Sequence, residues 1–136
     1  MAKTPKIDID STLLPYLHIT GYLNREEVYK HLKCSDLFMQ FSTGEGGVCN
    51  KSGSLAAAFV AGLPILGNKG DMTNQTLIDE EVIVFADKQG EENLPILISL
   101  LEHPAKRQLH AQRTRDYYEK YLDWSTIAEQ YLAWLT

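Results

Sequence analysis

The sequence lacks most of the features that mark specialised classes of protein. Its 136 residues include two cysteines, Cys34 and Cys49, which are too few for a disulfide framework and do not have the spacing of metal ligands. No apolar run approaches the roughly 20 residues of a membrane-spanning helix. The N-terminus, MAKTP at 1–5, lacks the apolar stretch found in secretory signals. These absences predict a reduced, cytoplasmic protein without a membrane span.

Positive charge is also scarce. The chain has 13 lysines and arginines against 18 aspartates and glutamates, which gives a formal net charge of −5. Proteins that bind polyanions usually present a basic face, and the basic residues here are scattered along the chain. We therefore expect no nucleic-acid partner.

Short segments rich in β-forming residues alternate with helical patterns along most of the chain. Residues 1–15 are polar and contain proline, so we expect a loosely ordered lead-in followed by one domain over residues 16–136. The predicted strands are Tyr16–Thr20, Asp36–Phe41, Pro64–Gly67 and Val82–Ala86. Strands separated by helices predict right-handed crossovers and a parallel sheet. The expected fold is α/β, a Rossmann-like parallel sheet of about four strands with flanking helices.

Two helices in the first half have clear boundary signals. Asn24 is followed three residues later by Glu27, the spacing of a capping box. Ser52–Ala61 is almost entirely small and apolar, which is typical of a buried helix, and Gly62 is placed to end it.

The last third of the chain predicts an all-helical segment. Three helical patterns follow one another without an intervening strand, at Glu91–Leu101, Pro104–Leu122 and Ser125–Leu135. Ser125 is expected to be the N-cap of the last helix, and Trp124 and Trp134 are interpreted as its packing residues.

A glycine-rich loop is the strongest candidate for a ligand site. Ligands of parallel α/β sheets bind at the carboxyl ends of the strands, and the loop over residues 42–52 leads from a predicted strand into the buried helix. The backbone N–H groups of Gly53, Ser54 and Leu55 would form an anion site suited to a diphosphate, with the charge of Lys51 beside it. The alternative interpretation is that the glycines only shape a strand-to-helix turn.

Four segments, in order, resemble the C-terminal domain of retaining GT-B glycosyltransferases, the large family that includes sucrose-phosphate and bacterial lipopolysaccharide glycosyltransferases. They are HITGYLNREEV at 18–28, CSDLFMQFSTGE at 34–45, SLAAAFVAGLPIL at 54–66 and YLDWSTIAEQY at 121–131. The resemblance covers about residues 16–135 and implies the later part of a nucleotide-sugar-binding domain.

The resemblance also implies roles for particular residues. Glu45 matches the glutamate that lies near the transferred sugar, and Ala57 occupies the place of the family's second glutamate. The loop from Gly46 and Gly47 to Leu55 resembles a subgroup that lacks the usual glutamate pair. The implied donor contacts are therefore made by Gly46, Gly47, Lys51, Gly53, Ser54 and Leu55.

The family's acceptor domain, and two donor-domain strands with a basic pair, have no counterpart among these residues. The resemblance thus implies the donor-binding portion of a hexosyltransferase that is inactive alone, and whether this chain is itself an enzyme stays open. The implied donor is a nucleoside-diphosphate sugar, without a metal or other cofactor. The implied partners are the missing N-terminal portion or a second copy of the chain. The alternative is a non-catalytic Rossmann-like module that binds another protein or a phosphate compound.

Overall fold

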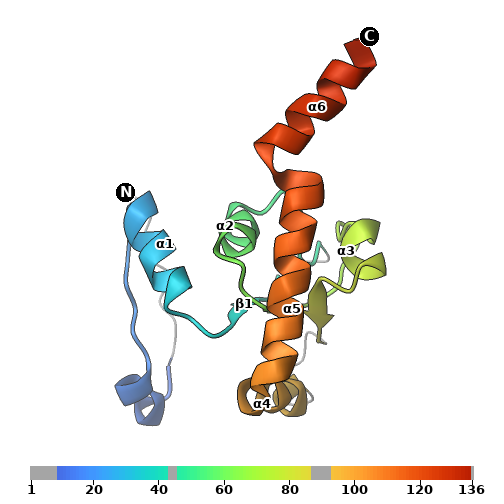
Figure 1. Ribbon diagram of the computed structural model, residues 1–136. Coiled ribbons are helices and arrows are strands. Elements are labelled where there is room, and N and C mark those ends of the chain that lie inside the picture. The colour runs from blue at the N-terminus through green and yellow to red at the C-terminus, as the bar shows by residue number, and fades with distance from the viewer. Residues whose placement is uncertain (1–8, 43–45, 87–92, 136) are drawn as a thin grey trace.

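The computed structural model describes residues 9–42, 46–86 and 93–135 (Figure 1). Its sheet has three strands in the order β1 (Phe38–Gln40), β2 (Ile65–Gly67) and β3 (Ile83–Phe85). Both strand pairs are parallel. The predicted α/β fold with a parallel sheet is therefore confirmed, whereas the expectation of about four strands exceeds the three found in the described residues.

Helices surround this short sheet (Figure 1). They are η1 (Ser11–Tyr16, a 3-10 helix), α1 (Arg25–Lys33), α2 (Gly53–Ala61), α3 (Gln75–Asp79), α4 (Leu94–Glu102), α5 (Pro104–Tyr117), η3 (Tyr118–Leu122, a π-helix) and α6 (Trp124–Leu135).

The sheet has a core on each of its two faces. On one face α2, α3 and α5 bring together a large cluster of buried side chains: Val48, Leu55, Ala58, Phe59, Ile65, Leu77, Val82, Ile83 and Tyr117. On the other face α4 contributes Leu100, which packs with Leu66 and Ala86. Ile65 and Leu66 are consecutive residues of β2 and point to opposite faces, as in any strand. A central strand covered on both faces is typical of parallel sheets.

The local signals in the first half are confirmed. Asn24 accepts the N–H of Glu27 at 3.0 Å, and the Glu27 carboxylate accepts the N–H of Asn24 at 2.9 Å, so the capping box is complete. Gly62 ends α2 in the left-handed conformation, with φ of 68°, which glycine adopts without steric cost.

The predicted strand Tyr16–Thr20 is wrong. Tyr16 is the last residue of η1, and residues 17–20 pair with no strand of the sheet. The segment runs beside α1 (Figure 1), where the ring of His18 stacks on that of His31 with centroids 6.5 Å apart. Tyr16 is 89% exposed. A strand needs a neighbour to satisfy its backbone groups, and this segment has none among the described residues.

The all-helical C-terminal segment is confirmed, but its details differ from expectation. The N-cap of α6 is Asp123, whose carboxylate accepts the N–H of Ser125 at 3.1 Å, so the prediction that Ser125 is the cap is wrong. The side chains of Trp124 and Trp134 are 80% and 81% exposed. Their interpretation as packing residues is therefore also wrong, because α6 projects away from the rest of the chain (Figure 1).

Candidate functional site

Two loops meet at the carboxyl ends of β1 and β2. The first reaches α2 through residues 46–52, and the second leads from β2 to α3 through residues 68–74. This is the edge of a parallel sheet where ligands are expected to bind. Glu45, the implied catalytic residue, lies outside the described residues.

Gly46 and Gly47 join the first loop to the second. The carbonyl of Gly46 accepts the N–H of Met72 at 3.0 Å, and Val48 donates to the carbonyl of Asn68 at 3.0 Å. Gly47 has φ of 64°, and a Cβ atom there would stand 2.3 Å from the amide nitrogen of Gly70. At Gly47, glycine is therefore required by close contact with the neighbouring loop.

The buried side chain of Asn68 fixes the beginning of the first loop. Its Oδ1 accepts the N–H of Ser42 at 2.7 Å, and its Nδ2 donates to the carbonyl of Ser42 at 3.4 Å. Asn68 is only 1% exposed, so its amide satisfies backbone groups at the end of β1 and is not available to a ligand.

The start of α2 is capped from within the chain. The hydroxyl of Ser52 accepts the N–H of Leu55 at 3.2 Å and donates to Oε1 of Gln40 at 3.1 Å. Leu55 is fully buried. Three N–H groups were expected to bind an anion here. The N–H of Leu55 is instead bonded to Ser52, so it is not available to an anion.

The other two N–H groups face solvent. Gly53 and Ser54 are exposed at the first turn of α2, and within the described ranges their N–H groups have no hydrogen-bond acceptor. Lys51 is exposed two residues before Gly53 and forms no ion pair with any described residue. A helix N-terminus carries partial positive charge, so these groups together are suited to an anion.

A partly buried polar network beneath the first loop, centred on the buried Tyr117, was not anticipated. The hydroxyl of Tyr117, on α5, accepts Nδ2 of Asn50 at 2.8 Å and lies 2.7 Å from Oγ1 of Thr76. The backbone N–H of Asn50 also donates to Oδ1 of Asn74 at 2.9 Å. The two residues paired with Tyr117 lie 67 and 41 residues from it in the sequence, so no local sequence pattern predicts these contacts.

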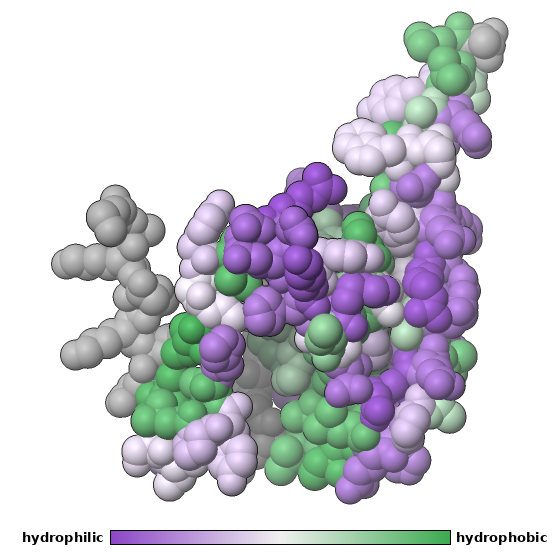
Figure 2. All heavy atoms as spheres, turned by 60° about the vertical axis from the view of Figure 1, so that its left-hand side comes forward, coloured by the Kyte–Doolittle hydropathy of each residue, from purple (hydrophilic) through white to green (hydrophobic). Residues whose placement is uncertain are grey.

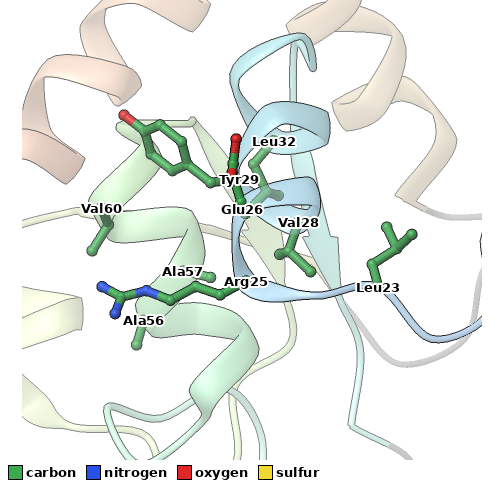
Figure 3. Close-up of a pocket in the computed structure, with 9 residues that line it drawn as sticks. All are labelled: Leu23, Arg25, Glu26, Val28, Tyr29, Leu32, Ala56, Ala57 and Val60. Carbon is green, nitrogen blue, oxygen red and sulfur yellow. The ribbon is translucent and has the colours of Figure 1, made fainter.

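A second concave surface lies apart from these loops. An apolar groove of about 690 Å³ runs between α1 and α2 (Figure 3). It is lined by Leu23, Arg25, Glu26, Val28, Tyr29, Leu32, Ala56, Ala57 and Val60. The sequence patterns singled out none of these residues as a surface for a partner.

In the parts of the chain that the structure describes, no three histidine, cysteine or acidic side chains are grouped as a metal site would require. Among the helices of those parts, none combines the length and the apolar character needed to cross a bilayer.

Comparison with protein-family models, curated proteins and solved structures gives no match.

Proposed function

We propose that this chain is the nucleotide-sugar donor-binding portion of a hexosyltransferase, and that it binds the diphosphate of the donor at the N-terminus of α2. The observation that carries the proposal is the pair of exposed N–H groups at Gly53 and Ser54, beside the exposed charge of Lys51. They lie at the carboxyl-terminal edge of a parallel sheet, where ligands of such sheets commonly bind.

The first loop and α2 supply the chemistry that such a donor needs. N–H groups at a helix start and a lysine stabilise the negative charge that grows on a departing nucleoside diphosphate. In the complete enzyme the acceptor is bound by other parts, so we expect this chain alone to transfer no sugar. Glu45, near the sugar by resemblance, and the backbone of Gly46 and Gly47 complete the proposed donor site.

The nucleotide is tested by thermal unfolding of the intact chain with UDP and with GDP. A ligand at ten times its Kd stabilises the folded state by about 1.4 kcal/mol, which for a chain of this size raises Tm by about 5 °C. We expect one of the two nucleotides to give such a rise. An unchanged Tm at saturating concentrations of both would refute donor binding.

The N–H donor at Gly53 is tested by a matched pair of variants. Proline is favoured at the first position of a helix and has no N–H, and Ser52 before it has an extended backbone with ψ of 118°, which a following proline accepts. Gly53→Pro therefore removes the backbone N–H while retaining the helix, whereas Gly53→Ala keeps the N–H. We expect the nucleotide-dependent rise in Tm to persist in Gly53→Ala and to fall by at least half in Gly53→Pro.

A second candidate function is a non-catalytic interaction or phosphate-binding module. It is favoured by the Ser52 cap, which leaves two N–H groups rather than three at the helix start, and by the packing of Gly47 on Gly70. Inorganic phosphate separates the two functions. If phosphate stabilises the chain as strongly as UDP and GDP do, the site recognises only the anion, and the donor proposal fails in favour of the module.

A further inference from the structure

Most of the large apolar side chains of α6 are exposed. Tyr131 and Leu132 are both 62% exposed, Leu135 is 83% exposed, and the apolar atoms are visible at the projecting end of the molecule in Figure 2. At helical spacing these residues lie on one side of α6 with Ile127, Trp124 and Trp134. The extended backbone of Asp123 directs this helix away from α1 and α2 (Figure 1).

The groove between α1 and α2 has the complementary shape and character. Its walls are formed by aliphatic side chains and the ring of Tyr29, with two small alanines, Ala56 and Ala57, at its α2 side (Figure 3). Small residues permit close approach of a third helix. An amphipathic helix in an apolar groove is a common mode of recognition between proteins.

The charges at the two surfaces are also opposite. Arg25 lines the groove and reaches from α1 toward Ala56 (Figure 3), and no carboxylate among the described residues pairs with it. The other charged residue of the groove, Glu26, is paired with Lys30 at 2.7 Å. Glu129 is the single charged residue of α6 and borders its apolar side next to Leu132. It has no cationic partner in the described parts of the chain.

We infer that the chain forms a twofold dimer in which α6 of each copy occupies the α1–α2 groove of the other. Because each copy carries both surfaces, α6 of each copy fills the groove of the other. The dimer is therefore closed and isologous.

The area available is sufficient for a stable dimer. A large aromatic side chain buries roughly 150–250 Å², so the exposed aromatic and leucine side chains of α6 offer on the order of 500 Å². Two α6–groove contacts, counted on both surfaces, would bury on the order of 2,000 Å², within the size of stable interfaces.

The first test is the solution mass of the intact chain, measured by light scattering over a range of concentrations. We expect a mass approaching twice the monomer's 15.4 kDa. A mass of one chain at every concentration would overturn the inference and would leave the proposed nucleotide site untouched.

Each surface is then altered separately. Trp134→Glu places a charge in the apolar side of α6, and Val60→Glu places one in the groove at a position already 52% exposed. We expect each variant to dissociate at least about tenfold more readily. Ala133→Glu adds the same charge on the opposite side of α6 and is expected to dimerise normally.

Mixing the variants distinguishes this arrangement from simple pairing of two α6 helices. Trp134→Glu retains an intact groove and Val60→Glu retains an intact α6, so an equimolar mixture can form one of the two contacts. We expect the mixture to form more dimer than either variant alone. If Val60→Glu by itself dimerises like the unaltered chain, the groove is not the binding surface and the inference is wrong.

The charge pair gives an independent check. Arg25→Glu and Glu129→Arg each place like charges together, and we expect each to weaken the dimer by about three- to tenfold. The double variant restores opposite charges and should recover most of the loss. Equal weakening in the single and double variants would contradict the orientation in which these two residues face each other.

Discussion

Gly47 and Gly70 lie in backbone contact across the two loops of the candidate site. A Cβ atom on Gly47 would stand 2.3 Å from the nitrogen of Gly70 and 2.7 Å from the carbonyl carbon of Lys69. The positive φ of Gly47 independently disfavours any larger residue. The contact fixes the position of one loop relative to the other.

We therefore predict that Gly47→Ala lowers the free energy of unfolding by at least about 2 kcal/mol, through backbone strain and overlap together. Urea denaturation measures this change. The control is Gly53→Ala, where an added Cβ has no atom within 4 Å and alanine favours the helix. If both variants unfold at the same urea concentration, the loops are not packed as described.

The hydroxyl of Tyr117 binds the side chain of Asn50 in the first loop. Tyr117→Phe removes this hydroxyl and keeps the aromatic ring. Its ring stacks on Phe59 with centroids 5.4 Å apart, and Tyr117→Phe keeps that contact. The change leaves the side chains of Asn50 and Thr76 without their partner. We predict a loss of about 1–3 kcal/mol in the free energy of unfolding. Tyr16→Phe, at a position of η1 that is 89% exposed, should change it by less than about 0.5 kcal/mol.

Glu80 gives the stability of the fold a dependence on acidic pH. The ammonium of Lys120 at 2.6 Å, and then the hydroxyl of Tyr121, hold the pKa of Glu80 below its ordinary value of 4.5. A carboxyl group whose pKa is lowered by folding stabilises the folded state above its unfolded pKa, and this stabilisation is lost as the pH falls through the folded pKa.

Glu80→Gln should therefore lower Tm near neutral pH, and the difference from the unaltered chain should disappear once the pH has fallen below the lowered pKa of Glu80. Glu119→Gln makes the same chemical change on the neighbouring helical segment and serves as the control. A difference for Glu80→Gln that persists undiminished at low pH would show that the charge is not responsible.

His110 should give the stability of the fold a dependence on pH near neutrality. Burial lowers the pKa of its imidazole below the ordinary 6.5, and the charges of Arg113 and Lys106 lower it further. The unfolded chain therefore binds a proton more readily than the folded chain, so stability is lost as the pH falls below about 6.5. We predict that His110→Gln flattens the change in Tm between about pH 7.5 and pH 5 relative to the unaltered chain. An equal change in Tm for both proteins would contradict this role of His110.

Features controlled by a few neighbouring residues were predictable from the sequence. The capping box of Asn24 and Glu27, and the left-handed ending at Gly62, follow from spacing alone and are present. Asp123 and Ser125 are both good caps. Asp123 becomes the cap because the π-helix that follows α5 ends at Leu122. No local sequence pattern predicts that end point.

Features that depend on distant neighbours were missed. Residues 16–20 are rich in β-forming residues, which fits a strand, but a strand forms only where another accepts its hydrogen bonds. The five-residue helix α3 is too short for a periodic signal. The side chain of Asn74 before it accepts no N–H of the helix and accepts the N–H of Asn50 instead. At the candidate site, the glycines were recognisable, but their contact with the second loop was not.

The link between Tyr117 and the two loops also sets an order of events during synthesis. Asn50 and Thr76 emerge from the ribosome well before Tyr117, from which they are separated by 67 and 41 residues. The short sheet can begin to assemble on the growing chain, but the loops gain this support only once α5 has appeared. The candidate site therefore reaches its final shape only after α5 has been made, although its own residues precede α5 in the chain.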